Sequence, residues 1–430
     1  MGASFNKNFL ATIIKTFSKP LRKRYDGHSC EEFPIVTLFN ALVGNSQRTE
    51  TQILNRKLES LLKSDSFSSP DLGRIVPHPS QMREHARGFP MEEANQMFLN
   101  VSKEVLLLLL EQGLIPKKIK VAFDFHEELY YGKKDNPHVI GILAEKGMKK
   151  AHSWHTCSLI LKGRELQVGS EMRKKGGFAK KFVAKMIEFL QSLEFLIELV
   201  VMDKEYYQKA ILKYLDEKEL VYIVPVRESK KLKAMKEAAL NEPKKRVQAF
   251  EMKDDHAKEK GYSLITFNAA FHGKRSISFG KLRAHYTKGT KDLKDILSNI
   301  FVLATNGLVQ APSVKKKYKF YKIREEYGGR WRIEISYRES NPFIMYSTSA
   351  DPNVRNFYFI ISLLLYNFWI IANSCLHKTR YWLAKVPKAY YKEDLKHVLL
   401  SVFQYYMNTD PPFSKFCRTK ELLIERCIII

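Results

Sequence analysis

Hydrophobic and polar positions change their spacing along the chain. In residues 1–115 apolar side chains recur at helical spacing, most clearly over 38–43, 51–62 and 91–113. That pattern predicts a helical N-terminal region. A Gly-Phe-Pro break at 88–90 separates a short basic helix from a long apolar one. A helix-turn-helix would fit this break, but two helices around such a break more often simply pack together.

From residue 119 short β-type runs replace the helical pattern. They lie at 120–125, 154–161 and 165–172, and the last two are joined by Lys162-Gly163-Arg164, a hairpin signal. An amphipathic helix at 178–195, a strand at 196–202, a helix at 206–215 and a strand at 220–226 follow. The order β-β-β-α-β-α-β predicts an α/β fold with a mixed sheet flanked by helices.

Residues 228–310 have a different pattern. A Lys-rich helical stretch precedes strand-like runs at 246–252, 262–271, 281–286 and 300–305, which we interpret as a β-rich insertion with its own small layer. Helical spacing returns after Lys315 and dominates to the end. The apolar run 357–371 is about 15 residues long, short of the ~20 that cross a bilayer. We expect a buried core helix there, and no membrane partner.

The charge of the chain favours one class of partner. Lys and Arg number 72 against 46 Asp and Glu, a net charge of +26. The basic clusters are dispersed, at 19–24, 117–120, 146–150, 173–175, 230–236, 244–246 and 315–322. Dispersed positive charge suits a surface that follows a phosphate backbone. A nucleic-acid-binding protein is therefore favoured over a protein whose surface is basic without such a partner.

Cysteine usage and the N-terminal segment bear on the compartment. The five cysteines include no CxxC pair and are odd in number, which argues against a disulfide scaffold or a cysteine zinc site and fits a reducing compartment. The N-terminal segment lacks the long apolar core of a signal peptide. We therefore expect a cytoplasmic protein.

Two aspartates follow apolar strands. Asp124 comes near the end of the 120–125 run, and Asp203 directly follows 196–202. Taken singly, each is best explained locally, Asp124 as a turn residue and Asp203 as a helix N-cap. Taken together they suggest a site, because side chains at the ends of neighbouring strands converge.

A third acid comes with an aromatic and a basic residue. Tyr327, Arg330 and Glu334 are spaced by three and four, so on a helix they share one face. An ordinary surface Arg–Glu pair has the same spacing. Trp331 lies between Arg330 and Glu334 in the sequence. Its ring could stack on a base or fill the hydrophobic core, and we slightly favour the core.

Other polar residues make weaker candidates. His126 points to the same side of its strand as Asp124. It could support the side chain of Asp124, but an ordinary polar histidine at the end of a strand is the more common case. His152 and His155 are not spaced like zinc ligands. The sequence contains no P-loop and no dinucleotide-binding glycine pattern.

The three acids and their surroundings resemble the DDE transposases of insertion sequences, in the group with a Tyr-Arg-Glu signature. The stretches that carry the resemblance are DFHEELYYG around Asp124, VVMDKEYY around Asp203 and YGGRWRIEISYRESN around Glu334, with LLLYNFWIIAN after them. Together they span roughly residues 119–373. Each is short, and it is their order and spacing that make the combination specific.

The resemblance implies a ribonuclease-H-like catalytic core interrupted by a β insertion between the second and third acids. The expected division is a helical DNA-binding or dimerisation region at 1–116, core at 117–227, insertion at 228–310, core at 311–376 and a helical C-terminal region at 377–430. The group usually has a Lys seven residues beyond the Glu, where this chain has Asn341. Arg338 is the alternative source of that positive charge.

The implied chemistry is phosphodiester cleavage with two divalent ions, Mg²⁺ or Mn²⁺, which prefer oxygen ligands. We expect Asp124, Asp203 and Glu334 to hold the metals, and the resemblance implies that Tyr327 and Arg330 contact DNA near the cut. The expected substrates are terminal inverted repeats and target DNA, bound by a homodimer on the nucleoid of a prokaryote. The alternatives are a ribonuclease-H-like nuclease without strand transfer and a catalytically inactive, transposase-derived DNA-binding protein.

Overall fold

The architecture is that of a computed structural model, which describes a large central part of the chain. The described residues are 84, 86–132, 136–145, 147–161, 164–253, 264–274, 277–307, 320–330, 334, 336–338, 343, 347 and 349–376. The helices expected at 38–43 and 51–62 and the C-terminal region from 377 lie outside them, as does most of the short basic helix before residue 88.

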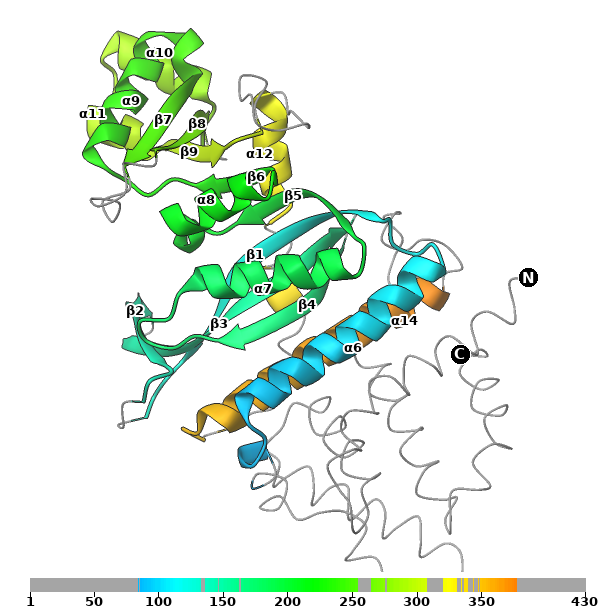
Figure 1. Ribbon diagram of the computed structural model, residues 1–430. Coiled ribbons are helices and arrows are strands. Elements are labelled where there is room, and N and C mark those ends of the chain that lie inside the picture. Colours follow the sequence, from blue (N-terminus) through cyan, green and yellow to red (C-terminus); the bar gives the residue numbers. More distant parts are fainter. Residues whose placement is uncertain are drawn as a thin grey trace, which may run out of the picture.

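A mixed sheet forms the centre of the described region (Figure 1). Its core strands are β1 (Lys118–Leu129), β3 (Met148–Leu161), β4 (Arg164–Met172), β5 (Leu196–Met202) and β6 (Tyr222–Pro225). They lie in the order β4-β3-β1-β5-β6, with β3 antiparallel to both β4 and β1, and β1, β5 and β6 parallel. The mixed sheet and strand order confirm the expected ribonuclease-H-like fold class. A further strand, β2 (Val139–Glu145), pairs with the start of β3 and was not expected.

Helices cover both faces of this sheet. On one face, α7 (Ala179–Ser192) packs Phe182 edge-on against Phe123 of β1, at 6.1 Å between ring centroids. On the other, α12 (Phe320–Gly328) buries Ile323 and Tyr327 among side chains of β1, β5 and β6. An ion pair of 2.6 Å between Lys120 and Glu326 ties α12 to β1. The short helix α8 (Lys209–Glu217) connects β5 to β6.

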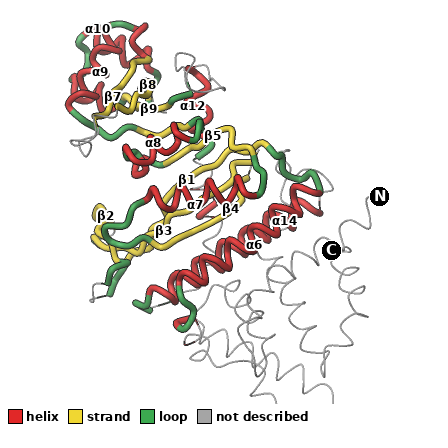
Figure 2. The backbone as a smooth tube through the Cα atoms, in the orientation of Figure 1, coloured by secondary structure: helices red, strands yellow, loops and turns green. Residues whose placement is uncertain are grey.

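Two long helices lie side by side along the β4 edge, α6 (Met91–Glu111) and α14 (Pro352–Leu376), as Figures 1 and 2 show. Their contact includes a buried hydrogen bond of 3.0 Å from Asn356 to Asn95, and Asn356 also accepts one from Trp154. By length and composition, α14 is apolar enough over Pro352–Ile371 to cross a membrane, but 94% of its most apolar 18-residue window is buried inside the protein. This burial agrees with the expected core helix.

The segment between β6 and α12 extends the central sheet instead of forming a layer of its own. β9 (Ile300–Thr305) pairs antiparallel with β6, and β8 (Leu264–Gly273) and β7 (Val247–Lys253) continue the sheet outward. The helices α9 (Lys230–Asn241), α10 (Phe279–Lys288) and α11 (Leu293–Ser298) accompany these strands (Figure 1). The expected insertion is therefore mixed α/β, and the separate layer was wrong.

The strand expected at 281–286 was also wrong, because these residues form most of α10. Helix caps at both ends explain the difference. The Ser278 side chain accepts a hydrogen bond from the backbone N–H of Lys281, and Gly289 ends the helix in the left-handed conformation, with φ of 61°. These caps satisfy backbone groups that a strand would have to pair elsewhere.

Candidate active site

Asp124 lies inside β1, which continues to Leu129. Its side chain points to the face that α12 covers, and only 6% of it is exposed. One carboxylate oxygen accepts a hydrogen bond from the backbone N–H of Phe125 at 2.9 Å, and the other from Arg330 Nη1 at 2.8 Å. The aspartate is thus a buried strand residue with a cationic partner, and the turn explanation does not apply.

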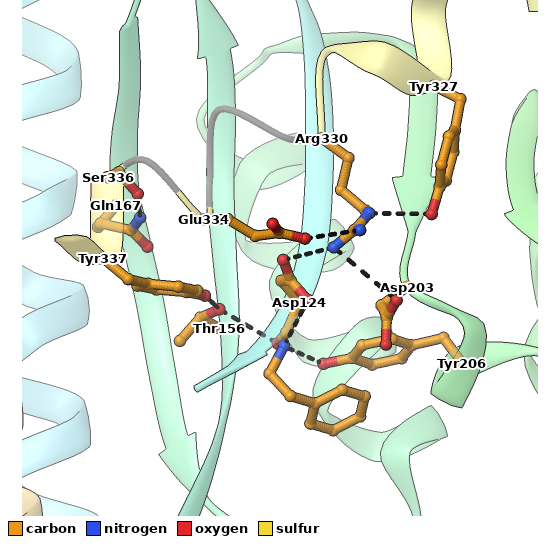
Figure 3. Close-up of polar contacts among 11 residues, drawn as sticks. Asp124, Thr156, Gln167, Asp203, Tyr206, Tyr327, Arg330, Glu334, Ser336 and Tyr337 are labelled. Atoms are coloured by element: carbon orange, nitrogen blue, oxygen red, sulfur yellow. Dashed lines mark hydrogen bonds and ion pairs between the residues drawn. The ribbon is translucent and has the colours of Figure 1, made fainter. Parts of the chain in front are cut away.

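Asp203 follows β5, the neighbour of β1 in the sheet. Its backbone N–H donates to the carbonyl of Phe123, which places it beside the residue before Asp124. It stands at the N-cap of the 3₁₀ turn Lys204–Tyr206, but its side chain makes no capping hydrogen bond. The carboxylate instead comes within 3.8 Å of Arg330 Nη1 (Figure 3). The convergence expected from adjacent strand ends is present.

The element that carries Glu334 differs from the expectation of one continuous helix. α12 ends at Gly328, and Gly329 and Arg330 form a tight turn in which their N–H groups donate to the carbonyls of Glu326 and Tyr327. Two adjacent glycines explain the break, because glycine has low helix propensity. Glu334 is helical again beyond the turn. The turn aims Arg330 at the acids, which the helical spacing alone does not predict.

Arg330 is the centre of the cluster. Its Nη1 contacts Asp124 and Asp203, its Nη2 donates to Glu334 at 3.0 Å, and its Nε donates to the Tyr327 hydroxyl at 3.0 Å. The guanidinium is 9% exposed, whereas the side chains of Asp203 and Glu334 are 27% and 45% exposed. All three predicted acids, and two of the three predicted DNA-contacting residues, therefore meet at one point (Figure 3).

The charges of this cluster do not balance. The pKa of Asp124 is raised to about 7: burial has the largest effect, Arg330 and the Phe125 N–H oppose it, and the nearby Asp203 and Glu334 add to the rise. Burial works against the charged form of Arg330, but the surrounding acids raise its pKa overall. Three carboxylates face one guanidinium, so the site attracts additional positive charge.

The backbone of Asp124 is held by residues that the sequence did not single out. Its carbonyl accepts hydrogen bonds from the hydroxyls of Thr156 and Tyr206, each at 3.1 Å, and Tyr337 hydrogen-bonds Thr156. His155 Nδ1 lies 3.0 Å from the Tyr206 hydroxyl, and burial lowers the pKa of His155 to about 3, so its ring is neutral. Position in the VVMDKEYY and ISYRE stretches was the only available signal for the two tyrosines.

The remaining predicted residues are placed as follows. Tyr327 is buried with its hydroxyl toward Arg330, and Arg338 is exposed to solvent. His126 stacks on Phe359 of α14 at 4.8 Å between centroids, and burial lowers its pKa to about 4, which fits packing. Trp331 and Asn341 lie outside the described residues.

The acids fit a divalent metal in chemistry, because carboxylate oxygens are the ligands that Mg²⁺ and Mn²⁺ prefer and the cluster has negative charge in excess. Their present arrangement is organised around a different cation. Among the described residues, no group of three or more His, Cys, Asp or Glu side chains is spaced to hold a metal ion, and the Arg330 guanidinium lies between the acids.

Two solved transposase structures are similar to this chain. The chain is similar to a piggyBac transposase synaptic complex with hairpin DNA, at 13% identity and a TM-score of 0.44, over 96% of this chain and 83% of that one. It is also similar to a Mos1 transposase paired-end complex with the left transposon end, at 11% identity and a TM-score of 0.16, over 42% and 60% of the two chains. A search of the curated proteins found no match.

The family comparison is more specific. Residues 183–368 match the family model described as the transposase DDE domain. The matched range includes Asp203, Arg330 and Glu334, whereas Asp124 precedes it and joins the site through the pairing of β1 with β5 and through Arg330. The resemblance noted in the sequence agrees with this match: residues 183–368 of the chain are similar to the transposase DDE domain.

Proposed function

We propose that the protein is a DNA transposase that nicks the ends of its insertion sequence and joins the liberated 3′-OH to target DNA. The observation that carries this proposal is the convergence of Asp124, Asp203 and Glu334, which come from two adjacent strands and a separate helical segment, on one guanidinium. A cluster with excess carboxylate at the open end of parallel strands suits metal-assisted phosphodiester chemistry.

Asp124, Asp203 and Glu334 are the residues that would hold two divalent ions, Mg²⁺ or Mn²⁺. When bound, such ions activate the nucleophile and stabilise charge on the leaving oxygen. Asp124 is the most buried of the three and the most firmly positioned, since the hydroxyls of Thr156 and Tyr206 hold its carbonyl. Of the three acids, it is therefore the one best positioned to hold a metal ion.

Arg330 has two roles in this proposal. It supplies positive charge that holds the acids together, and its contacts with them leave its planar guanidinium largely buried. Its planar guanidinium, with a fork-shaped set of donors, would also suit a DNA phosphate placed beside the acids. Tyr327, which is hydrogen-bonded to Arg330 Nε, and exposed Arg338 would contact the same DNA.

The proposed partners are double-stranded DNA, both as terminal inverted repeats and as target, and a second copy of this chain on paired ends. The net charge of +26 supports a polyanionic partner. A cytoplasmic location on the nucleoid goes with this function. The alternatives remain a ribonuclease-H-like nuclease and an inactive DNA-binding descendant, and the intact acid cluster favours an active enzyme over the latter.

A strand-transfer assay separates these functions. The substrate is a pre-cut DNA end that carries the inverted repeat read from the DNA flanking the gene, with supercoiled plasmid as target and Mg²⁺ or Mn²⁺ present. Covalently joined products support the transposase. Plasmid hydrolysis without joining identifies a nuclease, and DNA binding without either reaction identifies an inactive descendant.

A further inference from the structure

An exposed aromatic ring stands at the same end of the sheet as the acids. Phe178 is 73% exposed and directly precedes α7, at the end of the loop that leaves β4 at Met172. Met172 pairs with Trp154, and Trp154 pairs with His126, two residues beyond Asp124 along β1. The strand register therefore brings this loop to the same end of the sheet as the acids, on the face that α7 covers, whereas the Asp124 side chain lies on the opposite face.

Positive charge surrounds this ring. Lys174, Lys175, Lys180 and Lys181 flank Phe178 in the sequence, and all four are exposed. The first turn of α7 contains no acidic residue. A single exposed apolar residue is ordinary on a protein surface, but a phenyl ring among four lysines has the composition of a surface that binds a nucleic-acid strand. We call residues 173–181 the Phe178 loop.

The Phe178 loop is fixed to the core at several points. The backbone N–H of Arg173 donates to Ser153 at 2.7 Å, and that of Lys175 donates to Pro137 at 2.8 Å. The Arg173 guanidinium lies over the Phe125 ring at 4.5 Å, and Phe125 is the residue after Asp124. These contacts hold the loop at Arg173 and Lys175 relative to β1, which lowers the entropy cost of ordering it on binding.

We infer that the Phe178 loop binds an unpaired stretch of DNA beside the cleavage site, with the Phe178 ring stacked on a base and the neighbouring lysines on phosphates. This inference rests on the proposed function and specifies the form of DNA that the site accepts. Stacking requires a base that is free of its neighbour, and lysines supply attraction that is independent of sequence. The loop therefore binds DNA whose two strands are already separated, or stabilises the separation of the two DNA strands at the end of the insertion sequence.

A contact between two copies of the chain is the competing use of an exposed ring. The charge of the loop argues against it, because a symmetric contact would bring two sets of lysines together and like charges repel across an interface. No such cost arises with a polyanion.

The test uses the full-length protein and needs no knowledge of the inverted repeat. A labelled oligothymidine strand and a duplex of equal length are titrated in EDTA against the wild type, Phe178→Ala and Phe178→Tyr. We expect Phe178→Ala to weaken single-strand binding on the order of 10- to 100-fold, the range for loss of base stacking. Duplex binding should change much less, and Phe178→Tyr should bind like the wild type.

A fluorescence measurement reports on the position of the ring. In Phe178→Trp the new indole should be quenched on binding oligothymidine, after the wild-type tryptophan signal is subtracted. The matched control is Leu196→Trp, since Leu196 is 54% exposed at the first position of β5, the opposite end of the sheet from Asp203. Its fluorescence should not respond.

Two results would overturn the inference. One is equal single-strand affinity for Phe178→Ala and the wild type, with no quenching in Phe178→Trp. The other is a DNA-free dimer that becomes a monomer in Phe178→Ala, which would make the loop a protein interface. Failure of the proposed function is distinct, because the wild type itself would then neither join nor nick DNA.

Discussion

Replacing Arg330 with alanine tests the electrostatic account of the site. The substitution removes the cationic partner of Asp124, whose side chain is 6% exposed, and leaves it buried beside Asp203 and Glu334. Removing one member of a buried ion pair costs about 3–5 kcal/mol. We expect Arg330→Ala to lower the free energy of unfolding by about that amount at pH 8 in EDTA. Arg338→Ala, which removes an exposed arginine from the next helical segment, is the matched control.

The pH dependence of this loss has a definite sign. The pKa of Asp124 is already raised to about 7 with Arg330 present, and Arg330 lowers it, so it rises further in the variant. At pH 6 the variant can then protonate Asp124 and avoid the buried charge, so the loss should shrink as pH falls from 8 to 6. Urea denaturation at both pH values measures this difference in the free energy of unfolding between the variant and the wild type. A variant as stable as Arg338→Ala at pH 8, or a loss that grows on acidification, would refute this reasoning.

Two further predictions concern the scaffold. Asn367→Ala removes the α14 side chain that exchanges two hydrogen bonds, of 2.9 and 2.6 Å, with the backbone of Gln167 in β4. Each buried backbone group left unpaired costs about 1–3 kcal/mol. Urea denaturation should therefore show that the variant's free energy of unfolding is lower by clearly more than about 1 kcal/mol, and an unchanged value would contradict the pairing. Burial raises the pKa of Asp216 to about 6, so its contribution to stability is present below pH 4 and is lost as pH rises to 6. Thermal unfolding at pH 4 and pH 6 measures this: Asp216→Asn should lose less stability between the two pH values than the wild type. A larger loss in the variant would contradict a raised pKa for Asp216.

The parts of the fold that sequence could predict are those set by local pattern. The apolar runs and their order predicted the mixed sheet, because strands buried on both faces consist of nearly continuous apolar residues. The placement of Asp124 and Asp203 on neighbouring strands followed from the same pattern. The β2 strand was not predicted, although it is as long as the predicted β5. The expected domain boundaries at 116, 227, 310 and 376 remain a prediction.

What the sequence could not predict depends on contacts between distant residues. Arg330 and Asp124 are 206 positions apart, and nothing near either indicates that a guanidinium would occupy the centre of the acids. The tight turn at Gly329 creates that contact by ending α12. The pairing of β9 with β6 is equally non-local, and it turned an expected separate layer into an extension of the main sheet. Local propensity does not encode such choices.

The most direct test of the central claim is metal-dependent nicking by an Asp203→Ala variant. Asp203 is more suitable to replace than Asp124, because its side chain is 27% exposed and lies 3.8 Å from Arg330, so the fold depends on it less. Supercoiled plasmid is incubated with Mn²⁺ and with either protein, and salt-sensitive DNA binding is measured in parallel. The account predicts that the wild type nicks and that the variant binds DNA nearly as well but does not nick. Undiminished nicking by Asp203→Ala would contradict it.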